Sequence, residues 1–305
     1  GRMISGRISQ VIGMRFPTEP AHPKYGRAAA EISCPMAYFY TFSHGDTRRE
    51  VSVELYNYNG PNPDVQNLLG VGDFKPTKWR RSWINPPMGG DLATVQYTGV
   101  NWPLMRYSDI LLMLAETEIQ VHSAVTDTAK LALAEVRRRA FPEDMWTEKV
   151  DNYIADKSTS VDNFFNAIVD ERMWEFGGEL IRKNDLVRWN LMAKKIDDMQ
   201  TKMEEIINGQ DENVPRYLYY RLKEDGETLE ILNPDYNHPA DGAMLEGYSV
   251  KAWMANLSES NKIKAMGWIN ANLAGYDPLK NNHLFPLTNS IISTSNGTLS
   301  NDQIP

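Results

Sequence analysis

Hydrophobic residues recur at helical spacing in the middle of the chain, between residues 101 and 208. Apolar positions three or four residues apart from Phe165 to Phe176 predict the buried face of an amphipathic helix. Gly177-Gly178 ends this helix, and a second helical pattern runs from Glu179 to Asn208. The sequence therefore predicts two helices that meet at a tight glycine corner.

An earlier helical pair is predicted between Asn101 and Ala140. Asp127 begins the second helix of this pair, and Phe141-Pro142 ends it. On each helix a set of apolar residues shares one face: Tyr107, Ile110, Leu111, Leu114 and Val121 on the first, and Ala129, Leu133, Val136 and Ala140 on the second. Two such helices joined by a short turn resemble a tetratricopeptide hairpin.

The flanking regions lack this spacing and are rich in loops. In residues 1 to 100, which carry many Pro, Gly, Asn, Tyr and Trp residues, only Val51–Tyr56 alternates like a strand. Pro215–Arg221 predicts a further extended segment. The predicted fold class is mostly α-helical, with short strands. We interpret residues 1–305 as a single domain with a loop-rich ligand region (1–100), a helical region (101–208) and a loop-rich C-terminal region (209–305).

Charge and cysteine content exclude several classes of protein. The 305-residue chain has a formal net charge of -8 and shows no basic stripe, which argues against a general nucleic-acid binder. Arg137–Arg139 lies on an alanine-rich helix and is interpreted as a solvated face or a source of ion pairs. A single cysteine, Cys34, excludes an internal disulfide and a cysteine-based metal site. No apolar run is long enough to span a bilayer.

Charged residues of both signs cluster around the glycine corner. Their regular mixing is unlike a simple solvated face, so we expect them to form ion pairs across the corner. They are Glu171, Arg172, Glu175, Glu179, Arg182, Asp185 and Arg188. Arg106 and Asp109, at the start of the earlier helical pair, are likewise interpreted as a structural ion pair.

Several of these stretches match the motifs of a known family. The corner segment Glu171–Trp189 and the lead Asn101–Glu116, with its Asn-x-Pro followed by Arg-Tyr-x-Asp, resemble the signature motifs of the SusD/RagB family. Glu135–Ala140 matches a third motif, and Tyr276–Thr288 resembles the closing segment of the family. One departure is Leu180, which stands where the family commonly has glycine and suggests a displaced corner.

The resemblance implies a function as well as a fold. Family members are helical outer-membrane lipoproteins of Bacteroidetes that capture nutrients, usually glycans, for a TonB-dependent SusC-like transporter. A member would carry a lipid anchor near its N-terminus, and this chain lacks that context, so we interpret it as the C-terminal portion of a longer protein. The implied function is non-catalytic binding of oligosaccharide or polysaccharide on the extracellular face of the outer membrane.

Aromatic residues in the loop-rich region are the candidate ligand contacts. A sugar ring presents a flat apolar face that stacks on Trp or Tyr, and its hydroxyls require polar partners. Trp79 and Trp83 are the first choices, followed by Tyr56, Tyr58 and Trp102. Polar partners lie nearby in the sequence: Asn57, Asn59, Asn62, Asp64, Arg80, Arg81 and Asn85.

Two alternative functions remain open. A tetratricopeptide-like scaffold of the same family would bind peptide on a helical groove. An α-helical glycoside hydrolase would need two opposed carboxylates, and acidic residues are plentiful. Motifs for a nucleophile, a phosphate loop and a dinucleotide site are absent from the sequence, and the scattered histidines form no zinc motif. No catalytic residue, metal or cofactor is predicted.

Overall fold

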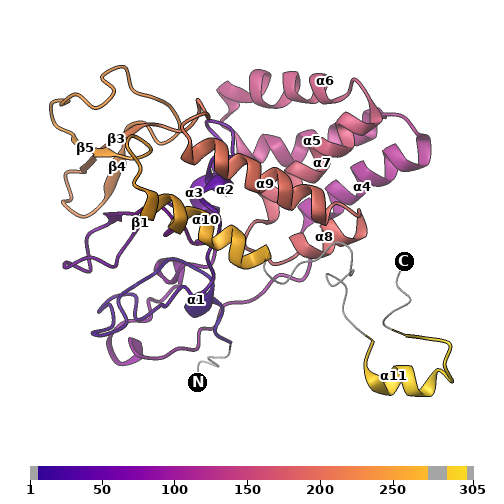
Figure 1. Ribbon diagram of the computed structural model, residues 1–305, viewed down its shortest axis with the longest axis horizontal. Coiled ribbons are helices and arrows are strands. Elements are labelled where there is room, and N and C mark those ends of the chain that lie inside the picture. The colour runs from indigo at the N-terminus through magenta and orange to yellow at the C-terminus, as the bar shows by residue number, and fades with distance from the viewer. Residues whose placement is uncertain (1–5, 274–286, 301–305) are drawn as a thin grey trace.

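A computed structural model describes residues 6–273 and 287–300 (Figure 1). Most of the segment Tyr276–Thr288 therefore lies outside the described residues. The elements in chain order are α1 (Ile8–Val11), α2 (Met36–Phe39), α3 (Arg48–Ser52), β1 (Tyr56–Asn57), β2 (Asn67–Leu68), η1 (Arg81–Trp83), η2 (Gly90–Leu92), α4 (Tyr107–His122), α5 (Asp127–Ala140), η3 (Glu143–Met145), η4 (Thr147–Asn152), α6 (Tyr153–Lys157), α7 (Val161–Phe176), α8 (Arg182–Arg188), α9 (Met192–Ile207), β3 (Tyr217–Leu222), β4 (Leu229–Ile231), β5 (Ser249–Ala252), α10 (Glu259–Leu273) and α11 (Asn289–Thr294). The mostly α-helical fold class is confirmed.

Helices α4 to α7 gather on one side of the molecule (Figure 1). Thr126 caps α5 by accepting a hydrogen bond from the amide of Ala129, and α4 and α5 form the predicted antiparallel hairpin. The predicted face of α4 was partly wrong. Leu111, Leu112, Ala115 and Ile119 are buried, whereas Tyr107, Ile110, Leu114 and Val121 are exposed. Both sets of apolar residues have helical spacing. Packing of α4 against α5 and α7 therefore decides which set is buried.

The long helix predicted from Glu179 to Asn208 is two helices. α8 ends at Arg188 and α9 begins at Met192. Between them Asn190 has a φ of 55°, a left-handed conformation that asparagine tolerates and that an α-helix does not contain. The predicted end of α9 next to Gly209, whose φ is 69°, is confirmed.

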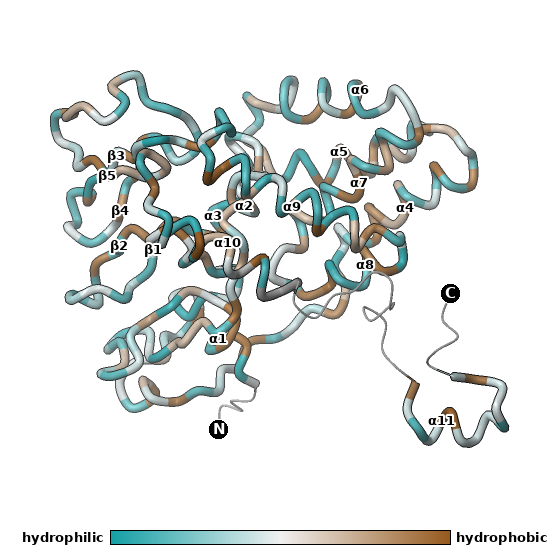
Figure 2. Tube along the Cα trace, in the orientation of Figure 1, coloured by the Kyte–Doolittle hydropathy of each residue, from teal (hydrophilic) through white to brown (hydrophobic). Residues whose placement is uncertain are grey.

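A hydrophobic core joins the loop-rich regions to α9. It brings together α2, Phe74, the inner face of α9, Leu218 of β3 and Trp253. The strands form a three-stranded antiparallel sheet in the order β4-β3-β5, which confirms the extended segment after Pro215. Trp253 follows β5 directly and is 1% exposed. Apolar and polar positions alternate along α5, α7 and α9 (Figure 2), as expected for helices with one buried face.

Residues 6 to 100 consist largely of loops that pack on short elements. The predicted strand Val51–Tyr56 was mostly wrong, because Arg48–Ser52 is helical and only Tyr56–Asn57 pairs, with β2. Val53 makes an isolated bridge to Pro76. No helix in residues 6–273 or 287–300 combines the length and apolar character that a membrane crossing requires.

Candidate functional site

The corner after α7 is built from backbone conformations that few residues adopt. Gly178 has a φ of 80°, and a Cβ atom on Gly177 would lie 1.7 Å from the hydroxyl of Tyr38. Leu180 itself has a φ of 60°, in the left-handed region. The corner is therefore not displaced by the departure from glycine. Leucine occupies the strained position, and 60% of its surface is exposed.

Replacing Leu180 by glycine is expected to raise the free energy of unfolding by up to about 1 kcal/mol, since glycine adopts a positive φ without steric cost. Urea denaturation would measure the change. Leu131→Gly is the matched control, because Leu131 is 63% exposed within α5. Glycine there should cost about 1 kcal/mol. A similar loss in both variants would contradict the strain at Leu180.

Buried ion pairs fix the corner to the surrounding helices. Glu171 is fully buried and accepts hydrogen bonds from Arg48 and Arg137, each at 2.6 Å. Glu175, which is 2% exposed, accepts from Arg106 at 2.8 Å. Further ion pairs join Arg48 and Arg139 to Glu175, and Arg106 and Lys78 to Glu179. These pairs connect α7 and the corner to the start of α3, to the start of α4 and to α5.

A second set of ion pairs extends the network along α8. Arg172 donates to Asp109 at 2.6 Å and to Asp185 at 2.8 Å. Arg188 donates to Asp185 and, through both terminal nitrogens, to Glu116. Arg106 and Asp109 are thus structural, as expected, but each pairs with α7 or the corner rather than with the other. The charged residues of the corner motif therefore mainly join neighbouring helices to one another. Few of them pair with each other inside the corner.

The electrostatics of Glu175 follow from its neighbours. Burial alone would raise its pKa, but the guanidinium groups of Arg48, Arg106 and Arg139 outweigh burial and lower the pKa to about 2. A carboxylate held ionised in this way is poorly suited to act as a general acid near neutral pH. The role of the densest cluster of carboxylates is therefore structural: its members form ion pairs that join helices.

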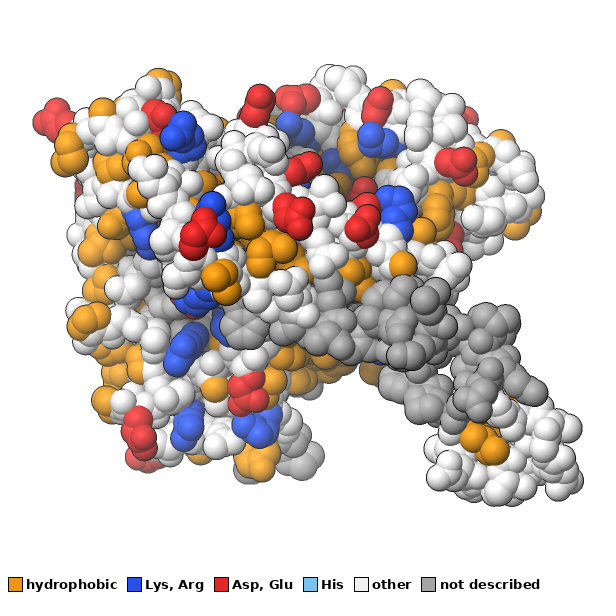
Figure 3. All heavy atoms as spheres, in the orientation of Figure 1, with side chains coloured by type: hydrophobic (Ala, Val, Ile, Leu, Met, Phe, Trp, Pro, Cys, Tyr) orange, Lys and Arg blue, Asp and Glu red, His pale blue; other side chains and the backbone are white. Residues whose placement is uncertain are grey.

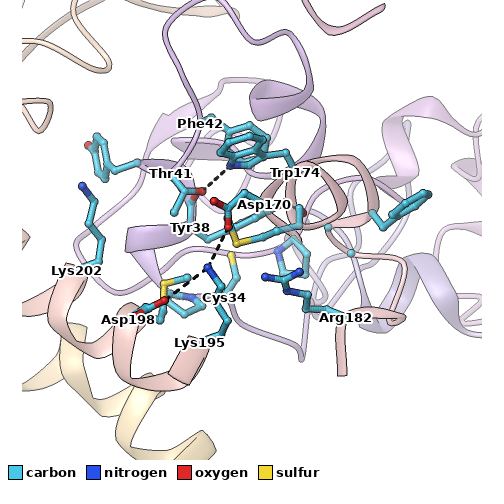
Figure 4. A pocket seen from close by; sticks show the side chains of 18 of the residues that line it. Cys34, Tyr38, Thr41, Phe42, Asp170, Trp174, Arg182, Lys195, Asp198 and Lys202 are labelled. Carbon is cyan, nitrogen blue, oxygen red and sulfur yellow. Dashed lines mark hydrogen bonds and ion pairs between the residues drawn. The ribbon is translucent and has the colours of Figure 1, made fainter. Parts of the chain in front are cut away.

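A groove of about 980 Å³ borders the corner and is lined mainly by apolar side chains (Figure 4). Its lining includes Met173 and Trp174 of α7, Met199 of α9, and Gly178 and Leu180 of the corner. Trp174 donates its indole hydrogen to the hydroxyl of Thr41 at 3.3 Å. On α9, Lys195 forms ion pairs with Asp170 at 3.1 Å and with Asp198 at 3.5 Å. Dashed lines mark both pairs in Figure 4. An apolar floor with charges at the edge suits an amphipathic ligand.

Trp79 and Trp102 lie together beside the corner. Their ring centroids are 5.1 Å apart, with 33° between the ring planes. The indole nitrogen of Trp79 donates to the carbonyl of Gly178 at 2.9 Å, and both rings are half-buried. This pair therefore braces the corner with one edge while part of each ring faces solvent.

Trp83 is the most accessible of the predicted contacts. It is 53% exposed, and the guanidinium carbon of Arg80 lies 4.2 Å from its ring centroid. Arg80 is itself 4% exposed and is fixed by hydrogen bonds to Glu54 at 3.0 Å, to the Tyr56 hydroxyl at 3.2 Å and to the carbonyl of Glu50 at 2.7 Å. A rigid cation thus supports one face of an exposed ring.

Tyr58 and Tyr56 belong to an aromatic cluster in the loop region. Tyr58 stacks on Phe16 with a centroid distance of 4.9 Å and an angle of 10°, and its hydroxyl accepts from Gln66 at 3.0 Å. Tyr56 meets Tyr58 edge to face at 6.0 Å. The ring of buried His22 also meets Tyr58 edge to face, so Tyr58 is packed within the cluster. Tyr56 lines a small pocket.

That pocket has a volume of about 320 Å³ and polar walls. Asn57 and Asn59 line it next to Tyr56, together with Glu54 and Arg15. It lies at the junction of the α1 loop, β1 and the segment before η1, and its remaining lining residues are Met14, Leu69, Asp73, Lys75 and Thr77. Amide groups and an aromatic ring in one pocket are the partners that a sugar residue requires.

The structure divides the predicted contacts into groups that the sequence does not separate. Trp79 pairs with Trp102, Tyr56 lies beside Tyr58, and buried Arg80 connects Tyr56 to Trp83. Arg81, predicted as a hydroxyl partner, is fully buried and donates instead to loop carbonyl groups. Sequence reasoning missed the role of Glu54 and Arg15 in the polar pocket, because neither lies in a recognisable motif.

Within residues 6–273 and 287–300, no group of three or more His, Cys, Asp or Glu side chains is placed to hold a metal ion. In the loop between β4 and β5, Asp235 accepts from Arg49 at 2.7 Å and from His44 at 2.9 Å. Positive and negative side chains lie interspersed on the face seen in Figure 3.

Comparison with known proteins identifies similar chains. The model of the SusD family matches residues 41–257. A SusD-like protein, P25 of Formosa agariphila, is 32% identical over 161 residues, which are 47% of this chain and 29% of that protein. A SusD homologue of Bacteroides thetaiotaomicron superposes with a TM-score of 0.53 and 21% identity over 67% of this chain and 40% of that chain. This likeness confirms the fold.

A surface glycan-binding protein A of Bacteroides thetaiotaomicron superposes less well, with a TM-score of 0.44 and 16% identity, over 98% of this chain and 47% of that chain. The chain thus spans less than half the length of the relatives that it matches: 29% of the Formosa protein and 40% and 47% of the two solved structures.

Proposed function

This chain belongs to the SusD family, and from that premise we propose that it contributes to non-catalytic binding of oligosaccharide at the cell surface. The proposed role is to deliver the bound glycan to a SusC-like TonB-dependent transporter in the outer membrane, to which a lipid anchor would attach the protein. The ligand contacts proposed are Trp79, Trp83, Tyr56, Tyr58 and Trp102.

One observation carries this proposal further than the family membership does. Trp83 is 53% exposed, and its ring rests on Arg80, a guanidinium that is already held by Glu54 and Tyr56. A platform that is rigid before the ligand arrives loses little conformational entropy on binding. Amide groups of Asn57 and Asn59 lie in the pocket beside Tyr56 and supply partners for hydroxyl groups.

Trp83→Ala is expected to weaken the binding of a glycan by about 1–3 kcal/mol, if stacking on a sugar face is comparable to stacking on a base. This corresponds to a dissociation constant roughly 5- to 150-fold higher. A glycan array would first identify a ligand, and isothermal titration calorimetry would measure the change. Trp83 is a cleaner choice than Trp79, whose indole also holds the corner through Gly178.

Tyr107→Ala is the matched control for this measurement, because Tyr107 is a 67% exposed aromatic residue on α4. It should leave the affinity unchanged. An affinity that is equal in the wild type and in Trp83→Ala would refute the platform. Release of reducing ends from the glycan in the same samples would instead favour a glycoside hydrolase.

The large apolar groove favours a second candidate, binding of a peptide by the same scaffold. Trp174, Met173 and Met199 would receive apolar side chains, while Lys195 and Asp198 lie at the edge for polar groups. A peptide-array signal that survives Trp83→Ala but is lost in Met173→Asp would support this candidate over glycan capture.

A further inference from the structure

Three Asn-Gly pairs occur in the sequence: Asn59-Gly60, Asn208-Gly209 and Asn296-Gly297. In such a pair the backbone nitrogen of the glycine reaches the side-chain carbonyl of the asparagine with little obstruction, because glycine has no Cβ atom. The three pairs share this local chemistry, so a large difference in their reactivity has to come from the fold. Asn59 follows β1 and lines the small polar pocket beside Tyr56.

The side chain of Asn59 is available for reaction. The residue is exposed, and its backbone amide donates to the side chain of Asn57 at 2.9 Å, but no described residue forms a hydrogen bond with its side-chain amide. The backbone nitrogen of Gly60 likewise donates to no residue in the described part of the chain. The two groups can therefore meet without first breaking a hydrogen bond.

The fold also favours glycine at position 60. A Cβ atom there would collide with the side-chain amide of Asn67 in β2. That amide is held in place, since it donates to the carbonyl of Val65 at 2.7 Å. The close packing between this loop and β2 thus retains the residue that makes Asn59 reactive.

The other two pairs provide a comparison within the same chain. In the turn that ends α9, Gly209 donates its backbone N–H to the carbonyl of Ile206 at 3.1 Å. Reaction at Asn208 has to break that bond. Asn296-Gly297 lies exposed after α11, and its glycine nitrogen has no hydrogen bond to a described residue. It is therefore an unprotected pair, like the pair after β1.

We propose that Asn59 is a site of spontaneous deamidation, which converts a neutral amide of the pocket into a carboxylate. The nitrogen of Gly60 loses its proton to hydroxide and attacks Cγ of Asn59. A C–N bond forms, the Cγ–Nδ2 bond breaks, and ammonia leaves with a proton taken from water. Water then adds to one carbonyl of the resulting succinimide ring and opens it, which yields aspartate or isoaspartate.

The product changes the pocket in two ways. The amide of Asn59 both donates and accepts hydrogen bonds, whereas a carboxylate only accepts, so a donor for a sugar hydroxyl is lost. The isoaspartate form also carries an extra methylene group in the backbone of the loop after β1. If the pocket binds glycan as proposed above, the affinity should fall as the deamidated fraction grows.

Peptide mapping by mass spectrometry, on folded protein stored at mildly alkaline pH, tests the proposal. Asn59 should convert roughly tenfold or more faster than Asn208, the scale of the hydrogen bond that protects Gly209. Conversion should accelerate as the pH rises, because the attacking nitrogen reacts as its anion. Protein unfolded in urea is the reference state, in which all three pairs should convert at similar rates.

Asn59→Gln is expected to abolish conversion at this position, because glutamine would have to close a larger ring, and to leave conversion at Asn296 unchanged. Equal rates at Asn59 and Asn208 in the folded protein would overturn the proposal. So would conversion of Asn296, or of the unfolded chain, while Asn59 of the folded protein stays intact.

Binding measurements separate this inference from the proposed function. Asn59→Asp supplies the carboxylate in pure form, and Asn59→Gln is the matched variant that keeps an amide. Weaker glycan binding by Asn59→Asp than by Asn59→Gln would support the effect on the pocket, and equal binding would reject that effect. A protein that binds no glycan would count against the proposed function and leave the result from mass spectrometry standing.

Discussion

Glu175→Ala is expected to lower the free energy of unfolding by about 3–5 kcal/mol, because it removes a buried carboxylate on which three arginines converge. Glu175 is 2% exposed and pairs with Arg48, Arg106 and Arg139. The loss would loosen the contacts of α7 with the start of α4, with α5 and with the start of α3. Urea denaturation at pH 7 measures it.

Glu135→Ala is the control, because Glu135 is an exposed residue of α5 and its replacement should change stability by no more than about 0.5 kcal/mol. Equal, small effects of the two substitutions would show that the ion-pair network does not hold the corner.

The same carboxylate should give the protein a characteristic acid sensitivity. Its pKa is about 2 in the folded protein and 4.5 in the reference state, so its contribution is present above about pH 4.5 and is lost as the pH falls toward 2. The shift corresponds to roughly 3 kcal/mol. Glu54 acts in another window: its raised pKa of about 7 stabilises the fold most below pH 4.5 and progressively less toward pH 7. A stability profile of Glu175→Ala that is as steep as the wild type below pH 4.5 would contradict this assignment.

Trp253→Ala is expected to cost a similar amount, about 3–5 kcal/mol, for a different reason. Trp253 is 1% exposed in the core beside Phe74, and its indole nitrogen donates to the hydroxyl of Tyr40 at 2.7 Å. The substitution leaves a cavity and removes a partner from a buried hydroxyl. Thermal and urea unfolding would both report the loss.

Trp83→Ala provides the contrast, because Trp83 is 53% exposed and should affect stability by less than about 1 kcal/mol. The two tryptophans should therefore separate cleanly: one substitution destabilises the fold, and the other weakens ligand binding. A large loss of stability in Trp83→Ala would mean that the ring is a packing residue and not a free platform.

Local sequence patterns predicted most of the helical region. The apolar spacing of α7, the glycine corner and the α4–α5 hairpin were all predicted correctly, because helix periodicity and glycine stops are properties of neighbouring residues. The family was recognised from the same stretches, since its signature charges are those of the buried network. Why those charges stand at fixed spacings became clear only when Arg48, Arg106 and Arg137 were seen to converge on α7.

The local sequence allows more than one arrangement at several positions, and the tertiary structure decides which one forms. It selected Leu112 and Ala115 over Tyr107 and Leu114 as the buried side of α4, because both stripes satisfy the helical period and only contact with α5 and α7 distinguishes them. It also placed Arg15 and Glu54, which are far apart in sequence, in the lining of one polar pocket. Helix periodicity is local and could be predicted from the sequence, whereas burial and charge balance depend on contacts between distant segments, which only the folded chain brings together.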